Sequence, residues 1–441
     1  METDKYIEEN SKLMEQPKGV RDFLPEDKLA RDYIINTLVR EFKKYGYNPL
    51  ETPALELLSV ATSKGGTEPG TDTYEEIYKL TDQGKRKLVL RYELTFQLAR
   101  VIAMNPQIPR PFKRYQIGQV WRDGPTKVGR YKEFTQCDVD VVGSSSMLAD
   151  AEILAMYNEI FKEFNLQVDV QVSNRKFLEG LLKSAGISKA KEAMISIDKL
   201  EKFGRDGVLN DARERGLDED SMIKALDLLE QEGTNNQLIK RYEELLKDPL
   251  AIEGLKELKD LFNYAVKLGA KFRFNPSLAR GLTYYTGPVF EVFLKSKKIT
   301  SSLCGGGRWD NMIGEFAGSK DRIPAVGTTF GLDTIYDALK AEGQLKSKKT
   351  STDVFIIPIG EVKDEAVQIL SELRGAGIKA DIDLMNRSPT KNLNFADSLG
   401  IPYVLFVGKL ELAKKKVKLR DMKSGKEKII TIKEVIKQLL Q

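Results

Sequence analysis

The chain has 441 residues, of which 41% are hydrophobic and 31% are charged, and its formal net charge is +5. This length predicts two or three folded units, because a domain usually has roughly 100–200 residues. The charge permits a nucleic-acid partner without demanding one. No stretch approaches the roughly 18 uncharged apolar residues of a membrane span, and the first residues lack the apolar core of a signal peptide, so we expect a cytoplasmic protein.

The sequence contains no histidine. This removes the commonest general base and metal ligand. The two cysteines, Cys137 and Cys304, have no spacing typical of a metal or redox site. Any chemistry must therefore use carboxylates, lysine, arginine, tyrosine, serine or threonine, or groups of the substrate, and we predict no metal bound by the protein itself.

The first half of the chain predicts helices and strands in alternation. A helix begins at Pro25 and stops near Gly46, with apolar residues at helical spacing between them. A short strand is expected at 88–92, followed by a helix from about Thr95. Two further strands are expected at 112–122 and 133–142, and the polar loop DGPTKVGRYK joins them.

The second half begins with a leucine-rich, charged stretch that is predicted to be helical. Strands return near 287–294, a helix starts after Gly331, and strands and helices alternate again in the last ninety or so residues. We therefore expect a catalytic body in two parts (1–173 and 268–342), a helical insertion (174–267), a linker (343–352) and a C-terminal α/β unit (353–441).

The strand expected at 133–142 has two different faces, because side chains alternate along a strand. One face carries Cys137, Val139 and Val141, and the other carries Gln136, Asp138 and Asp140. The polar face is either the floor of a pocket or a face wetted by solvent.

Charged groups near this strand also have two interpretations. The loop before the strand carries four cations, Arg122, Lys127, Arg130 and Lys132. They either bind the phosphates of a substrate or form a solvated basic loop. Glu93 and Thr95 suit an ammonium group, or they are a surface glutamate and a helix N-cap.

Two segments near the end of the body are unusual. ARGLTYYTGPVFE, at 279–291, contains adjacent tyrosines that would point to opposite faces of a strand. A buried tyrosine needs a partner for its hydroxyl, which is an imidazole or, more commonly, a backbone carbonyl. SSLCGGGRWDNMIG, at 301–314, has three consecutive glycines that let the backbone approach a flat ligand closely.

Together these segments resemble the histidyl-tRNA synthetases from about Lys18 onward. KGVRDFLPED and Thr52-Pro53 resemble the region of motif 1, which forms the dimer interface of class II synthetases. FKRYQIGQVWRDGPTKVGRYKEFTQCDVDVVG resembles motif 2, and PAVGTTFGLDTI takes the place of motif 3. RGLTYYTG and LCGGGRWDNMIG resemble the two signature peptides of the histidine enzyme, here of an archaeal or eukaryotic-like type.

This resemblance implies an α+β class II catalytic domain, in which helices flank an antiparallel sheet, with a helical insertion and a C-terminal α/β anticodon-binding domain. It implies a cytoplasmic homodimer that uses ATP, Mg²⁺ bound through ATP, L-histidine and histidine tRNA.

The resemblance also implies roles for individual residues. ATP would be bound by Arg122, Arg130 and Arg280, with Arg122 and Arg280 catalytic at the α-phosphate. Histidine would be bound by Glu93, Thr95, Gln136, Asp140, Arg280, Tyr284 and Tyr285. Arg387 and Lys391 are candidate tRNA contacts.

Three positions depart from the family pattern. Thr334 stands where motif 3 has an arginine that contacts ATP, Thr283 replaces an acidic residue, and Trp309 replaces a tyrosine. These departures admit an alternative, a non-catalytic paralogue that binds histidine and regulates a partner. The apparent anticodon-binding module favours the enzyme.

Overall fold

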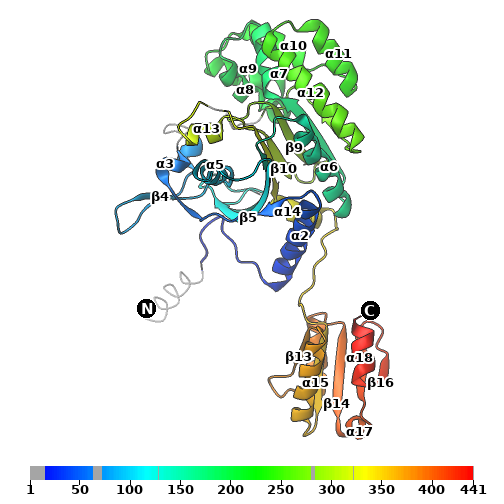
Figure 1. Ribbon diagram of the computed structural model, residues 1–441. Coiled ribbons are helices and arrows are strands. Elements are labelled where there is room, and N and C mark those ends of the chain that lie inside the picture. The colour runs from blue at the N-terminus through cyan, green and yellow to red at the C-terminus, as the bar shows by residue number, and fades with distance from the viewer. Residues whose placement is uncertain (1–14, 63–71, 128, 280–283, 321, 441) are drawn as a thin grey trace, which may run out of the picture. The chain divides into compact units, whose positions relative to one another are not determined.

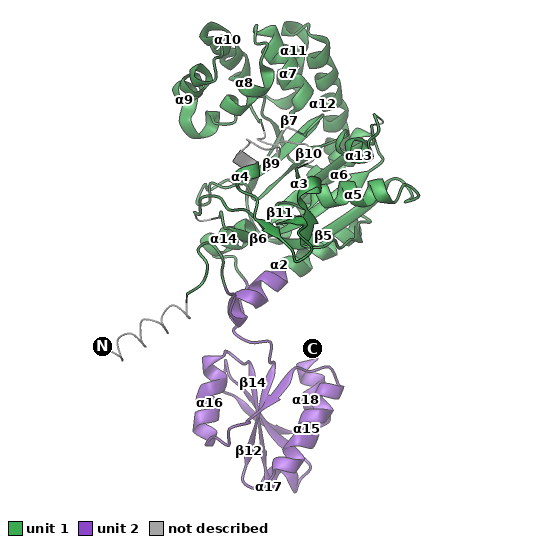
Figure 2. Cartoon of the chain, turned by 90° about the vertical axis from the view of Figure 1, so that its left-hand side faces the viewer, with its two compact units in different colours: residues 1–21, 34–345 green, residues 22–33, 346–441 purple. Residues whose placement is uncertain are grey.

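The computed structural model describes residues 15–62, 72–127, 129–279, 284–320 and 322–440. The chain separates into two compact units, which are coloured in Figure 2 and described here one at a time. Unit 1 comprises residues 1–21 and 34–345, and unit 2 comprises residues 22–33 and 346–441. In the described part of the chain, no helix has the length and apolar character needed to cross a membrane.

Unit 1 is built on an eight-stranded sheet with the order β1-β5-β6-β11-β10-β9-β7-β8 (Figure 1). Its strands are β1 (Asn48–Pro49), β5 (Phe112–Trp121), β6 (Glu133–Val142), β7 (Val168–Asn174), β8 (Arg273–Phe274), β9 (Pro288–Leu294), β10 (Cys304–Arg308) and β11 (Ala325–Gly331). The centre is antiparallel, as expected, but β1–β5 and β7–β8 are parallel pairs at the two edges. The sheet is therefore mixed, because long connections join these edge strands and allow them to run in the same direction.

A smaller sheet and several helices surround this sheet. The smaller sheet was not expected from the sequence and has the order β2-β4-β3, with β2 (Leu55–Leu57), β3 (Lys79–Thr81) and β4 (Lys87–Leu90). The helices are α2 (Pro25–Lys44), of which residues 34–44 belong to this unit, α3 (Leu58–Ala61), α4 (Asp72–Glu75), α5 (Thr95–Met104), α6 (Met147–Glu163), α13 (Met312–Phe316) and α14 (Leu332–Ala341). Helix α2 begins at Pro25 with two acidic residues and ends with two lysines, which complements the helix dipole.

One face of the central sheet forms an aromatic core with α2 and α6. Phe42 of α2 lies 5.8 Å from Tyr115 and 5.4 Å from Phe330 between ring centroids. Tyr157 of α6 lies 5.5 Å from the same Phe330 ring. Since alternate residues of β5, β6 and β11 point to this core, the residues between them point to the opposite face of the sheet.

Six helices form the segment between β7 and β8. They are α7 (Arg175–Ser184), α8 (Ala190–Ile197), α9 (Leu200–Glu214), α10 (Glu219–Leu229), α11 (Asn235–Leu245) and α12 (Pro249–Lys267). Side chains cap four of their N-termini, from Asn174, Asp218, Thr234 and Asp248. These helices occupy the stretch that the leucine-rich pattern predicted to be helical.

Unit 2 is a five-stranded sheet with helices on both faces, in the order β13-β12-β14-β15-β16. Its elements are β12 (Val354–Ile359), α15 (Lys363–Gly375), β13 (Ala380–Ile382), α16 (Pro389–Ser398), β14 (Tyr403–Gly408), α17 (Lys409–Leu412), β15 (Val417–Asp421), β16 (Glu427–Ile430) and α18 (Ile432–Leu439). Strands β12, β13 and β14 are parallel, and they lie in the stretch where strands and helices were expected to alternate. The antiparallel pair β15–β16 was missed, because both strands are short and β15 directly follows a run of lysines at 414–416.

The centre of the unit 1 sheet depends on glycine at position 306. A Cβ atom at Gly306 would lie 2.1 Å from the carbonyl oxygen of Gly327 and 2.6 Å from Cα of Thr328. Both are backbone atoms, which cannot move without disturbing the pairing of β10 and β11. The Gly306→Ala variant is therefore expected to lose about 1–3 kcal/mol of unfolding free energy, measured by urea denaturation.

The matched control is Gly84→Ala in an exposed turn of the same unit. There the nearest atom to a new Cβ is Asp82 Oδ1, on a side chain, at 3.3 Å. The unfolding free energy of this variant is expected to lie within about 0.5 kcal/mol of that of the parent. Equal stabilities for the two variants would contradict the close approach of β10 and β11.

Candidate active site

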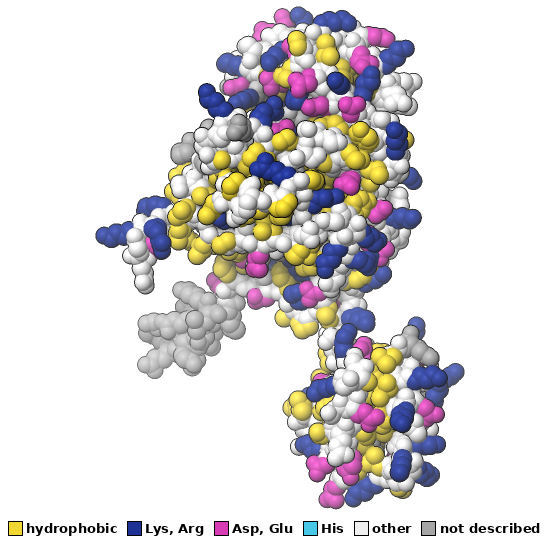
Figure 3. All heavy atoms as spheres, viewed as in Figure 1, with side chains coloured by type: hydrophobic (Ala, Val, Ile, Leu, Met, Phe, Trp, Pro, Cys, Tyr) yellow, Lys and Arg dark blue, Asp and Glu magenta, His cyan; other side chains and the backbone are white. Residues whose placement is uncertain are grey.

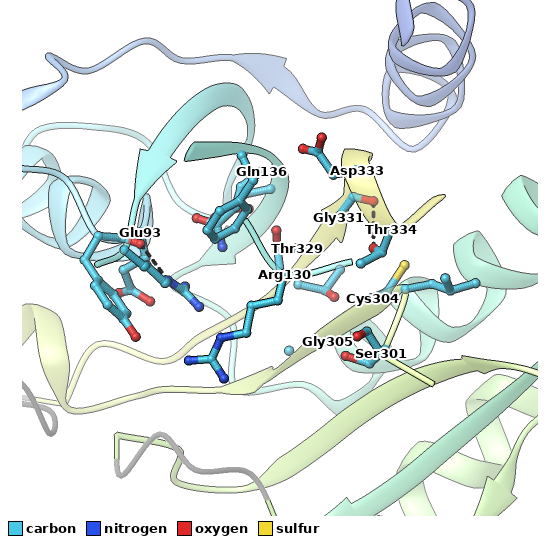
Figure 4. Close-up of a pocket in the computed structure, with 18 of the residues that line it drawn as sticks. Glu93, Arg130, Gln136, Ser301, Cys304, Gly305, Thr329, Gly331, Asp333 and Thr334 are labelled. Carbon is cyan, nitrogen blue, oxygen red and sulfur yellow. Dashed lines mark hydrogen bonds between the residues drawn. The ribbon is translucent and has the colours of Figure 1, made fainter. Parts of the chain in front are cut away.

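A cavity of about 610 Å³ opens on the polar face of the unit 1 sheet (Figure 4). It is lined by residues of the 92–95 junction, β6, the loop before β6, the 301–309 segment and the 327–334 segment. Eight residues predicted from the sequence line it together: Glu93, Thr95, Arg122, Arg130, Gln136, Asp140, Tyr284 and Tyr285. Their roles remain predictions, but the structure places them around one space.

The floor of the cavity is the polar face of β6. Gln136, Asp138 and Asp140 line it, while Cys137 and Val139 are buried on the other face. The prediction that the polar face of this strand forms the floor of a pocket is therefore confirmed, and the alternative of a face wetted by solvent is wrong. Burial raises the pKa of Asp140 to about 7, and the neighbouring Arg114 and a hydrogen bond from Trp309 act in the opposite direction.

Arg114 is a residue of this site that the sequence analysis missed. It lies on β5 directly opposite Asp140, and its side chain is 0% exposed. Its Nη2 atom is 2.7 Å from Asp140 Oδ2 and 4.0 Å from Asp138 Oδ2. A charged residue on the pocket face of the neighbouring strand was visible in the sequence, but the register that places it opposite Asp140 was not.

Glu93 and Thr95 lie at the start of α5 and are both buried. The helix N-cap is Leu94, so the interpretation of Thr95 as the cap and of Glu93 as a surface residue is wrong. The Tyr284 hydroxyl donates a hydrogen bond of 3.2 Å to Glu93 Oε2. Burial raises the pKa of Glu93 to about 7, although the positive charge of Arg122 opposes the shift. A buried carboxylate of this kind is suited to an ammonium group.

Cations line another part of the cavity. The guanidinium carbon of Arg122 lies 4.1 Å from the Tyr92 ring centroid, and its Nε donates to the Tyr92 carbonyl at 3.2 Å. Arg130 projects into the cavity in Figure 4 and forms an ion pair of 2.8 Å with Glu76. Lys127 also lines the cavity. Lys132 instead pairs with Asp123, so the solvated-loop interpretation holds for this residue.

The two adjacent tyrosines are not on a strand. Strand β9 begins only at Pro288, and Tyr284 lies in a turn before it. Both rings therefore lie on the cavity side, 4.7 Å apart between centroids, instead of alternating across a sheet. The Tyr285 ring occupies the space beside Gly307, where a Cβ would lie 2.9 Å from Tyr285 Cδ1.

Two of the departures from the family pattern also line the cavity. Trp309 is buried. Thr334 is buried and uncharged, and its hydroxyl donates to the Gly331 carbonyl at 3.0 Å, as the dashed line in Figure 4 marks. Gly129 of the loop before β6 packs close to it, because a Cβ there would lie 3.5 Å from Thr334 Cγ2. The residue at position 334 therefore contributes no positive charge to the cavity.

Four predicted residues are not part of the described cavity. Arg280 and Thr283 lie outside the described residues. Arg387 and Lys391 belong to unit 2. The guanidinium carbon of Arg387 lies 4.3 Å from the Phe395 ring centroid, and Lys391 is in the first turn of α16, which Ser388 caps.

Known families match both parts of the chain. Residues 19–335 match the profile of the family "Histidyl-tRNA synthetase", and residues 353–441 match that of the "Anticodon binding domain". A protein named "Histidine--tRNA ligase 1" from Bacillus cereus is 43% identical over 97% of this chain and 99% of its own length. The "Histidine--tRNA ligase" of Finegoldia magna is 35% identical over 96% of this chain and 98% of its own.

A solved structure agrees. The histidyl-tRNA synthetase of Nostoc sp. has a TM-score of 0.84 and 29% identity, covering 97% of this chain and 98% of its own. These relatives are bacterial, so they lend no support to the expectation of an archaeal or eukaryotic-like type.

The raised pKa of Glu93 gives a test of the site without any ligand. The folded protein retains a proton on Glu93 up to about pH 7, whereas the unfolded chain releases it at lower pH. Burial of Glu93 therefore lowers stability progressively between about pH 4.5 and 7, and the full loss is present above pH 7. At pH 8 the Glu93→Gln variant should be more stable than the parent by about 1–3 kcal/mol, and at pH 5 the difference should shrink.

Urea unfolding at the two pH values measures this difference. Glu315→Gln, an exposed change on α13, is the control and should show no pH-dependent gain. A Glu93→Gln variant that loses stability equally at both pH values would contradict the assigned burial of a titrating carboxylate.

Proposed function

This chain belongs to the histidyl-tRNA synthetase family and is a histidine–tRNA ligase, and we propose that ATP and histidine react in the cavity of its unit 1. One observation carries this proposal. The same cavity is lined by arginines, which suit phosphates, and by buried carboxylates, which suit an amino group and an imidazole. A ligand with phosphates at one end and the groups of histidine at the other would satisfy both.

The reaction has two steps. The histidine carboxylate attacks the α-phosphorus of ATP in line, which forms histidyl-adenylate and releases pyrophosphate. The terminal hydroxyl of the tRNA then attacks the carbonyl carbon of the adenylate, and AMP leaves. The first step needs alignment and neutralised charge more than a protein base. This requirement is compatible with a chain that has no histidine.

At the phosphate end, Arg122 would bind the α-phosphate and Arg130 the outer phosphates. Arg280, outside the described residues, is proposed to lie near the α-phosphate and the histidine carboxylate. Because Thr334 supplies no charge, we assign part of the phosphate binding to Lys127, which begins the turn that packs on Thr334. Mg²⁺ would enter with ATP and neutralise charge on the leaving pyrophosphate. Within the described ranges, no cluster of three or more acidic or cysteine side chains is arranged to hold a metal.

At the carboxylate end, Glu93, Thr95 and Gln136 would bind the α-ammonium group of histidine. Asp140 would accept a hydrogen bond from the imidazole, and Tyr284 and Tyr285 would enclose the ring. A site built around such an acceptor rejects ligands of the same shape that lack the N–H group, since the carboxylate would be left without a partner.

We further propose that the enzyme is a cytoplasmic homodimer that binds tRNA through unit 2, with Arg387 and Lys391 among the contacts. Hydrophobic side chains gather on the face of unit 1 near α3 and α5 in Figure 3. The exposed ones from this part of the chain include Leu55, Leu57, Leu80 and Met104. Exposed apolar surface of this kind supports a subunit interface there.

The direct test is exchange of labelled pyrophosphate into ATP, measured with Mg²⁺ and each of the twenty amino acids in turn. Exchange with histidine alone is expected. The Arg280→Ala variant should lose exchange while remaining dimeric by light scattering. Histidine binding without any exchange by the parent would favour a regulatory paralogue, and near-normal exchange by Arg280→Ala would remove its assigned role.

The Asp140→Ala variant separates the two ends of the cavity. Its KM for histidine should rise at least about 30-fold, because a hydrogen bond to a charged group is worth about 2 kcal/mol. Its KM for ATP should change less than about threefold. Equal rises in both constants would count against Asp140 as the imidazole contact.

A Lys127→Ala variant tests the phosphate assignment. Its KM for ATP should rise with little change in the KM for histidine, and Thr334→Arg in the same chain should restore much of the loss. Lys132→Ala is the control, since Lys132 belongs to the same loop but pairs with Asp123. An unchanged KM for ATP in Lys127→Ala would contradict the assignment.

A further inference from the structure

Arg114 has no role in the assignments above, although it is among the largest fully buried side chains of the described chain. It lies behind the cavity and does not line it. We propose that Arg114 is a positioning residue for histidine selection, which favours the ionised form of Asp140 and orients it as a hydrogen-bond acceptor for the imidazole. This inference rests on the proposed role of Asp140.

The register of the sheet sets this geometry. Arg114 and Asp140 are directly opposite in the antiparallel pair β5–β6, so their side chains lie on the same face. The ion pair between Arg114 Nη2 and Asp140 Oδ2 is 2.7 Å long. None of the guanidinium nitrogens makes a hydrogen bond to the described residues, and the other ion pair, with Asp138, is longer at 4.0 Å. Its contact with Asp140 is therefore the main interaction that it makes.

The surroundings of Asp140 contain more negative than positive groups. Asp138 of β6 and Glu93 before α5 are buried carboxylates near it, and Tyr47, after the end of α2, interacts with it electrostatically. The Trp309 indole acts as a neutral donor. Of the arginines near this cluster, Arg114 is the one that touches Asp140, while Arg122 acts mainly on Glu93. Without Arg114, burial beside other carboxylates would leave Asp140 protonated at neutral pH.

Protonation would change what Asp140 can recognise. An ionised carboxylate only accepts hydrogen bonds and suits an imidazole N–H, whereas a protonated one presents an O–H donor on one oxygen. On the far side, Gly327 leaves room for the carboxylate, since a Cβ there would lie 1.9 Å from Asp140 Oδ1. Arg114 therefore fixes one oxygen from behind, and the glycine leaves the other turned to the cavity.

The test compares the KM for histidine and the KM for ATP in pyrophosphate exchange between pH 6.5 and 8.5. In Arg114→Gln, the KM for histidine should rise at least about tenfold at pH 7 and fall again toward pH 8.5, because each pH unit changes the ionised fraction of Asp140 up to tenfold. The KM for ATP should stay the same. Arg114→Lys should recover most of the affinity for histidine, since it restores the charge.

The control is Lys113→Gln, the neighbouring cation on the other face of β5, where Lys113 pairs with Glu152 at 2.8 Å. It should leave both constants unchanged. A purely structural role for Arg114 predicts equal losses for both substrates with no pH dependence. That result, or an unchanged histidine profile in Arg114→Gln, would overturn the proposal.

A double variant covers the case in which Arg114→Gln does not fold. Arg114→Gln with Asp140→Asn removes both charges and keeps the shapes. If Arg114 acts through Asp140, the double variant should bind histidine as weakly as Asp140→Asn alone. A further loss beyond Asp140→Asn would overturn the proposal. If Asp140→Asn itself binds histidine normally, the proposed role of Asp140 fails first, which separates the two conclusions.

Discussion

The site depends on the absence of side chains on two neighbouring strands. Asp140 can occupy its position because Gly327, opposite it on β11, has no Cβ to collide with it. Gly307 leaves space for the Tyr285 ring, and Gly306 lets β10 approach the backbone of β11. A sheet interior is normally filled on both faces. Here one face carries the aromatic core around Phe330, and the other is hollow because glycines stand where large residues would fill it.

The hollow face carries buried charges, and these shape its energetics. Glu93 and Asp140 both have a pKa near 7 because of burial, so the cavity is an unfavourable environment for their negative charges. Arg114 and Arg122 offset part of this cost from two directions. A ligand that brings an ammonium group and an N–H donor would offset more of it. Under the proposed assignment, binding and selectivity would arise from the same unfavourable burial.

Local sequence patterns predicted much of this arrangement. The alternation in β6 identified the pocket face, and the sequence also predicted the helical insertion, the pair of strands around the polar loop and eight cavity residues. Features that depend on pairing between distant segments were not predictable. The register that places Arg114 against Asp140, the parallel edge strands and the β2-β4-β3 sheet all belong to this class. The start of β9 was expected within one residue, but the adjacent tyrosines were treated as strand residues, whereas they lie before the strand.

The lack of histidine has a practical consequence for the cavity proposed to recognise imidazole. Because the chain has no imidazole of its own, every imidazole resonance in a magnetic resonance spectrum of the untagged protein with its amino acid would come from the ligand. The tautomer and protonation state of the bound ring would be observable without isotope filtering or assignment of the protein.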